Sequence, residues 1–146
     1  MVETALIILP MFAIFFAIID FSLAIFVKSS LQHAVREGVR FAVTYQVEPG
    51  LCQDDSIKNV VVQQSMGFLS TPEGREKIHI RYYLPDTLSP TAENMPGNIV
   101  EVSVEDFTWG WVAPIWRNNS PLGMLVRSSD RMEGLPGGAS PPCRTP

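Results

Sequence analysis

The sequence predicts an α+β protein in which one long N-terminal helix carries a small antiparallel sheet. Three observations predict it: residues 5–27 are almost continuously apolar, residues 28–45 repeat apolar positions at helical spacing, and three later runs resemble strands. A helix followed by consecutive strands is the order expected when the sheet packs on one face of the helix.

The first element is an apolar run long enough to cross a membrane. About 23 residues at a rise of 1.5 Å give a helix of roughly 35 Å, against a hydrocarbon core of roughly 30 Å. The run is longer than the apolar core of a secretory signal peptide and lacks a basic start, so we expect an anchor that is retained. Pro10 lies inside the run and predicts a kink, which membrane helices tolerate.

The same helix is expected to continue beyond the membrane. After Lys28, apolar residues recur on one helical face, at Leu31, Val35, Gly38 or Val39, Ala42 and Tyr45. The Glu48-Pro49-Gly50 turn then ends the pattern. The result is one helix of about 44 residues and roughly 65 Å, half in lipid and half covering the soluble domain.

Two acidic residues are unusual for an anchor, because Glu3 precedes the apolar run and Asp20 lies near its far end. An unpaired carboxylate in lipid costs roughly 3 kcal/mol and usually needs a partner. Asp20 shares one side of the helix with three alanines, Ala13, Ala17 and Ala24. Small residues let helices approach closely in lipid. This side either packs against another helix or reflects the ordinary alanine content of membrane helices.

The remaining elements are short. Asp54-Asp55-Ser56 offers an N-cap for a second helix that reaches about Phe68 and ends near a turn at residues 71–74. Three runs then predict about three strands, and the second of them alternates apolar and polar residues: 77–84, 98–107 and 124–131. Residues 85–97 and 109–123 are turn-rich connections.

These elements divide the chain into three parts. Residues 1–28 form the transmembrane half of the long helix, 29–133 a small α+β domain that includes its amphipathic half, and 134–146 a Pro/Gly-rich tail. The formal net charge is −4 and no basic run occurs, so nucleic acid is not an expected partner.

Motifs of catalysis and of cofactor binding are absent from the sequence. It has no Gly-rich phosphate loop, no Gly-x-Ser-x-Gly, no CxxC pair and no His-x-x-x-His. We therefore expect a protein that is not an enzyme and that has no cofactor and no metal site.

Cys52 and Cys143 both lie beyond the apolar run. In an oxidising compartment they can pair and close a loop of about 90 residues, which adds about 4 kcal/mol in the chain-entropy model. The alternative is that both are free thiols, with Cys143 in a disordered tail.

Three tryptophans lie within eight residues, at Trp109, Trp111 and Trp116. Indole has an apolar body and a polar edge, so the three can form an exposed surface for a partner or for the membrane interface. The alternative is that they close one end of a small core.

Several blocks of the sequence resemble the TadE-like family, the pseudopilin-like components of tight-adherence (Flp) pilus systems. The blocks are Val2-Glu3-Thr4-Ala5-Leu6-Ile7 with Pro10, Ile18-Ile19-Asp20-Phe21, and Ala34-Val35-Arg36-Glu37-Gly38-Val39-Arg40-Phe41-Ala42. The likeness is strongest over residues 2–42 and is fainter in Val102-Ser103-Val104, Pro114-Ile115 and residues 128–133.

The resemblance implies a pilin-like fold and an assembly role without catalysis. Lys28, Arg36 and Arg40 follow the span, which taken alone places the C-terminal domain in the cytoplasm. The family instead implies a single pass through the bacterial inner membrane with this domain outside the cytoplasm. The implied partners are other pilin-like subunits and the pilus assembly machinery, with a prepilin peptidase if a leader is present.

Within that resemblance, Glu3 is expected to pair with the α-amino group of a neighbouring subunit and so to fix the register of adjacent helices. Asp20 is expected to meet a basic residue of a partner or to be protonated. The alternatives to a pseudopilin are a filament subunit or tip component, and a membrane-anchored module that binds a ligand through residues 109–116.

Overall fold

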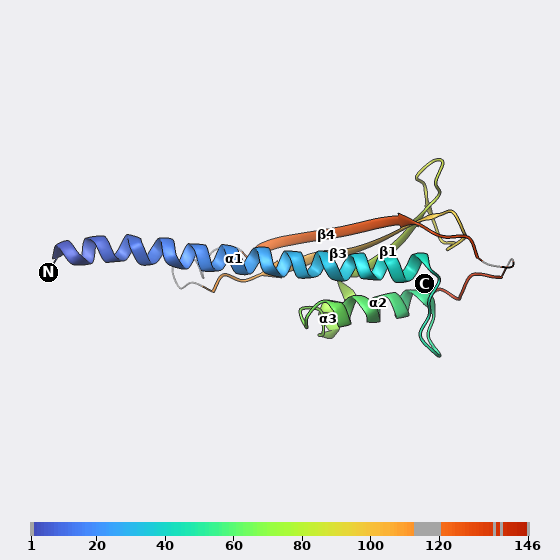
Figure 1. The fold of residues 1–146 in the computed structure, drawn as a ribbon, viewed down its shortest axis with the longest axis horizontal. Helices are drawn as coiled ribbons and strands as arrows, with labels where there is room; N and C mark the ends of the chain where they lie inside the picture. The colour runs from blue at the N-terminus through green and yellow to red at the C-terminus, as the bar shows by residue number, and fades with distance from the viewer. Residues whose placement is uncertain (1, 113–120, 136, 138, 146) are drawn as a thin grey trace.

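The structure, a computed structural model, describes residues 2–112, 121–135, 137 and 139–145. Its elements follow one another in this order: α1 (Val2–Val43), α2 (Gln53–Gln64), α3 (Pro72–Glu76), β1 (Ile78–Tyr83), β2 (Pro90–Thr91), β3 (Ile99–Trp109) and β4 (Leu122–Arg131). The predicted α+β fold is confirmed, because a long apolar helix, a short second helix and an antiparallel sheet are all present (Figure 1).

α1 is a single helix of 42 residues that includes Pro10. It ends before the turn at residues 48–50 that the sequence favoured. Tyr45 adopts a φ of 55°, and the backbone nitrogens of Tyr45 and Gln46 donate to the carbonyl oxygens of Ala42 and Phe41, at 3.0 and 3.4 Å. Two such bonds satisfy the last carbonyl groups of a helix, as in a Schellman motif.

The start of α2 differs from the prediction. Cys52 is the N-cap residue, with extended backbone and no side-chain capping bond, so the N-cap expected at residues 54–56 is wrong. Asp54 and Asp55 lie instead in the first turn, where a negative charge is favoured by the helix dipole. The turn expected at residues 71–74 is the start of α3, and Thr71 caps it by accepting a hydrogen bond from the Gly74 nitrogen at 3.1 Å.

The sheet has four antiparallel strands in the order β2-β1-β3-β4. The three expected strands are β1, β3 and β4, and the two-residue β2 lies within the connection predicted for residues 85–97. β3 extends two residues beyond its predicted end at residue 107, and its pairing with β4 shifts between Val104 and Phe107. Asp106 lies in this bulge with a φ of 55°, and the extra residue returns Phe107 to the buried face.

The C-terminal half of α1 lies between the sheet and α2, whereas the N-terminal half extends beyond the domain (Figure 1). Gly38 lies where α1 approaches its neighbours closely: a Cβ atom there would lie 2.5 Å from Val61 of α2 and 3.8 Å from Val102 of β3. Around it, the core contains mainly aliphatic residues, including Leu31, Ala34, Val35, Val39, Ile57, Val61, Val100, Val102 and Val104.

Candidate assembly and anchoring site

The N-terminal half of α1 presents large apolar side chains outward. Those exposed on it include Leu6, Ile7, Leu9, Phe12, Ile14, Phe15, Ile18 and Phe21. By length and composition, the part of α1 at Leu6–Val43 is a candidate membrane span. Exposed apolar surface of this extent costs about 25 cal/mol per Å² in water, so the helix is suited to single-pass anchoring in a membrane.

The predicted stripe of small residues runs from this exposed half into the core. Ala13 and Ala17 are half-buried, whereas Asp20 and Ala24 are 1% and 5% exposed. Ala24 belongs to the hydrophobic core of its own chain. Ala13 and Ala17 are therefore the alanines of the stripe that a neighbouring helix can reach, and their assembly role stays a prediction.

Asp20 is engaged within its own chain. Its Oδ1 accepts a hydrogen bond of 3.0 Å from the backbone nitrogen of Val112, which follows β3 and is 92 residues away in sequence. A buried carboxylate needs such donors, because transfer from water without them is costly. The bond joins the membrane-proximal end of the sheet to the apolar half of α1.

Glu3 lies in the first turn of α1, and its pairing with a neighbouring subunit remains a prediction. No residue of the described chain combines with others into a cluster of three or more His, Cys, Asp or Glu that could hold a metal ion.

The three tryptophans do not share one environment. Trp109, at the end of β3, is partly buried against the core, and its ring meets Phe68 edge-on at 6.2 Å. Phe68 meets Phe26 of α1 in the same manner at 6.3 Å. Trp109 thus closes one end of the core, Trp111 is half-buried, and Trp116 lies outside the described residues.

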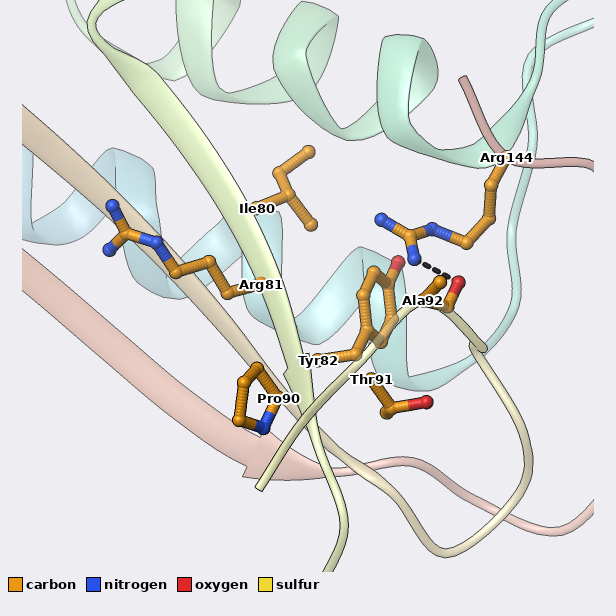
Figure 2. Close-up of a pocket in the computed structure, with 7 residues that line it drawn as sticks. All are labelled: Ile80, Arg81, Tyr82, Pro90, Thr91, Ala92 and Arg144. Atoms are coloured by element: carbon orange, nitrogen blue, oxygen red, sulfur yellow. Dashed lines mark hydrogen bonds between the residues drawn. The ribbon is translucent and has the colours of Figure 1, made fainter. Parts of the chain in front are cut away.

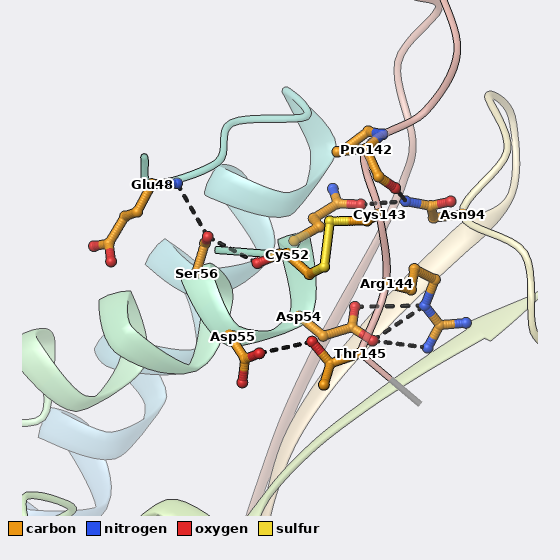
Figure 3. Close-up of a disulfide and its surroundings, with 11 residues drawn as sticks. Glu48, Cys52, Asp54, Asp55, Ser56, Asn94, Pro142, Cys143, Arg144 and Thr145 are labelled. Carbon is orange, nitrogen blue, oxygen red and sulfur yellow. Dashed lines mark hydrogen bonds and ion pairs between the residues drawn. A yellow bond between two sulfur atoms is a disulfide. The ribbon is translucent and has the colours of Figure 1, made fainter. Parts of the chain in front are cut away.

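The C-terminal residues 142–145, here called the C-terminal strap, pack on the start of α2 (Figure 3). A disulfide joins Cys52 to Cys143, and the backbone nitrogen of Gln53 donates to the Cys143 carbonyl oxygen at 2.8 Å. Pro142 accepts a hydrogen bond from the Asn94 side chain at 3.0 Å. The tail is therefore held to the domain at its far end.

Arg144 of the strap reaches a buried carboxylate. Its Nη2 lies 3.0 Å from Oδ2 of Asp54, whose side chain is 5% exposed, and its guanidinium lies over the Tyr82 ring at 4.2 Å. The Tyr82 hydroxyl donates to Oδ1 of Asp54 at 3.1 Å. Burial and the adjacent Asp54 charge raise the pKa of Tyr82 well above its usual range, so the hydroxyl remains a hydrogen-bond donor.

Arg144 and Tyr82 also border a surface pocket of about 520 Å³, which includes residues of β1 and the β2 region (Figure 2). Two of its lining residues, Arg144 and Tyr82, belong to the network just described. Arg144 already has partners in the chain, because its Nη1 also donates to the Ala92 carbonyl. The network therefore fixes the strap rather than leaving a vacant charged site.

The outer face of the sheet carries an ion pair. Arg81 of β1 donates two hydrogen bonds to Glu105 of β3, at 2.5 and 3.0 Å, and its Nη1 lies 3.7 Å from Glu101. These bonds lower the pKa of Glu105 to about 2. One arginine thus offsets part of the negative charge of the two glutamates on a half-exposed strand face.

Sequence reasoning missed the residues of the strap network. Asp54 resembled an N-cap because of its place before an apolar pattern, and Arg144 stood in a tail with no predicted structure. Only the cysteine pair signalled that residues 52 and 143 meet, and that pattern left free thiols as an equal alternative. Asp20 was identified as needing a partner, and a backbone amide of the same chain is one such partner.

Comparison with known proteins gives one match. No curated protein and no solved structure matches the chain. Residues 1–40, which contain most of α1, match the family model described as TadE-like protein, and this match confirms the resemblance of the chain to the TadE-like family.

Proposed function

We propose that this protein is a membrane-anchored pseudopilin that takes part in assembling a tight-adherence (Flp-type) pilus without catalysing a reaction. The TadE-like match points to that pilus system. The observation that carries the proposal is that α1 extends beyond its own domain, with exposed apolar side chains from Leu6 to Phe21. Such a helix is available for packing against other helices in the inner membrane.

The proposal places the sheet and α2 outside the cytoplasm. The Cys52–Cys143 disulfide supports this side, because disulfides persist in the periplasm and are rare in the cytosol. The proposed partners are other pilin-like subunits and the assembly machinery. These contacts are made by the half of α1 that the domain does not cover.

The small residues of α1 give the sharpest test. Replacing Ala13 and Ala17 together by leucine is expected to reduce both surface piliation and co-purification with pilin-like subunits, because added bulk separates the packed helices. The protein should remain in the membrane at normal abundance, since leucine favours insertion. Electron microscopy of cells and pull-down from solubilised membranes measure the two effects.

Ser22→Leu is the matched control. Ser22 is exposed and lies about 2.5 turns from Ala13, on the opposite side of the helix. The Ser22→Leu substitution should leave surface piliation normal. Normal piliation and co-purification in the Ala13→Leu, Ala17→Leu protein would contradict assembly through this side of α1.

A further inference from the structure

The apolar surface of α1 continues into a groove on the domain. α1 and the first residues of β4 enclose about 300 Å³, lined mainly by Phe21, Ala24, Ile25, Lys28, Leu122 and Leu125. Four of these are large apolar side chains that remain exposed: Phe21 is 64% exposed, Ile25 57%, Leu125 50% and Leu122 37%. The groove is thus continuous with the exposed face of the membrane-span candidate rather than an isolated patch.

The position of the groove relative to a membrane follows from Asp20. Asp20 lies inside the apolar run and accepts a hydrogen bond from the backbone nitrogen of Val112, just after β3. Ile25 lies only about 7.5 Å further along the helix, at 1.5 Å per residue. When the apolar run spans a bilayer, the groove therefore lies where the acyl chains meet the headgroups.

The groove carries one positive charge at its outer end. Lys28 is exposed, and among the described residues no carboxylate forms an ion pair with its ammonium group. The other lining residues are uncharged. An apolar groove that ends in a single cation at the headgroup level is complementary to a lipid, in which an acyl chain is followed by a phosphate.

We propose that this groove binds an anionic phospholipid, with an acyl chain against Phe21, Ile25 and Leu122 and the phosphate paired with Lys28. The bound lipid fills the gap between α1 and β4 and seats the sheet on the membrane surface. The proposal rests on the membrane anchoring of α1 and is independent of the pilus role. A failure to bind lipid would therefore leave the pilus role open, and normal lipid binding would not establish it.

Photocrosslinking identifies what occupies the groove. The full chain, made with p-benzoylphenylalanine in place of Leu125, is illuminated in native membranes, and the adducts are identified by mass spectrometry. Leu88 is the control position, because it is 64% exposed but follows β1 at the opposite end of the sheet. A phospholipid adduct at position 125 and none at 88 supports the proposal. An adduct with a protein at 125, or equal lipid labelling at both positions, overturns it.

Lys28→Gln tests the charge. In nanodiscs of mixed phosphatidylglycerol and phosphatidylcholine, native mass spectrometry of the released protein measures which lipid is retained. Loss of one lysine near the surface should reduce the preference for phosphatidylglycerol about fivefold, whereas Arg36→Gln, two turns further from the groove, should not. An unchanged preference in Lys28→Gln would overturn the pairing of the phosphate with this lysine.

Discussion

Asp54 is the residue on which the attachment of the C-terminal strap depends. Its oxygens accept hydrogen bonds from Tyr82 and from Arg144, and its side chain is almost fully buried. Asp54→Ala removes the ion-pair partner of the Arg144 guanidinium and leaves the buried Tyr82 hydroxyl without its acceptor. We expect a loss of about 3 kcal/mol in the free energy of unfolding, the lower end for a broken buried pair, because water reaches Arg144. Denaturant unfolding of the protein in detergent measures it.

Asp55→Ala is the matched control, one residue away in the same turn. Asp55 lies 3.8 Å from Arg75, with side chains 33% and 40% exposed, and its Oδ2 accepts an exposed hydrogen bond of 2.7 Å from Thr145 of the strap. Because both contacts are exposed to water, we expect this variant to lose only about 1 kcal/mol. Equal losses in the two variants would contradict a special role for Asp54.

Glu105 gives the protein a pH-dependent contribution to stability. Its hydrogen bonds from Arg81 lower its pKa from 4.5 to about 2 in the folded state. A lowered folded pKa means that the contribution is present above the unfolded pKa and is lost as the pH falls from about 4.5 towards 2. Arg81 is 42% exposed, so we expect only about 0.5–1 kcal/mol.

Glu105→Gln should therefore be less stable than the wild type at pH 7 and equally stable near pH 2. Thermal unfolding at the two pH values measures the difference. A gap that stays constant across this range would show that the ion pair with Arg81 does not cause it.

Glu3 is expected to matter for assembly rather than for insertion. It lies in the first turn of α1, near a membrane interface where an acid is cheap to place. Glu3→Ala should leave the amount of protein in the membrane unchanged, since removing a charge does not hinder insertion, while reducing surface pili and association with sibling subunits. Glu3→Gln separates charge from hydrogen bonding. Wild-type piliation in Glu3→Ala cells would rule out the assembly contact.

At the scale of elements, the close packing of α1 against Val61 of α2 requires a glycine at position 38. A Cβ at Gly38 would lie 2.5 Å from the Val61 Cγ2 atom, closer than packed atoms approach. Gly38→Ala gains up to about 1 kcal/mol of helix propensity, but overpacking costs about 1–3 kcal/mol. We expect a net loss of about 1 kcal/mol in unfolding free energy, measured by denaturant. Gln32→Ala, at an exposed position of α1, should cost less than about 0.5 kcal/mol.

The elements with strong periodicity could be predicted from the sequence. The apolar run and the 3.6-residue spacing gave α1, and the alternation of Val100, Val102 and Val104 with polar residues gave β3. β2 could not be predicted, because two residues in a turn-rich connection are too few to show an alternation of apolar and polar side chains. α1 ends a few residues before the Glu48-Pro49-Gly50 turn, because Tyr45 takes the left-handed conformation that stops the helix.

At the scale of the whole molecule, links between segments far apart in sequence help to hold the described parts of the chain together. The Asp20–Val112 hydrogen bond spans 92 residues and the Cys52–Cys143 disulfide spans 91. Neither link is encoded in local pattern, since each depends on which distant segments the fold brings together. The sequence could identify Asp20 and the cysteines as residues in need of partners, but not the backbone amide or the strap that supplies them.

The disulfide also connects the fold to the compartment in which the protein lies. If the domain is outside the cytoplasm, Cys52 and Cys143 should resist maleimide labelling in freshly isolated membranes, and the protein should migrate faster without reductant than with it.

Replacing both cysteines by serine should lower the free energy of unfolding by up to about 4 kcal/mol, because the open chain gains loop entropy when it unfolds. The loss in unfolding free energy should be smaller than this limit if the Arg144–Asp54 pair still holds the strap. Adding Arg144→Gln to the double serine variant should then cost more than the disulfide change alone. An alkaline phosphatase fused after Pro146 reports the side of the membrane independently of the thiols. Full labelling of both cysteines together with an inactive, expressed fusion would place the domain in the cytoplasm and contradict the proposed orientation.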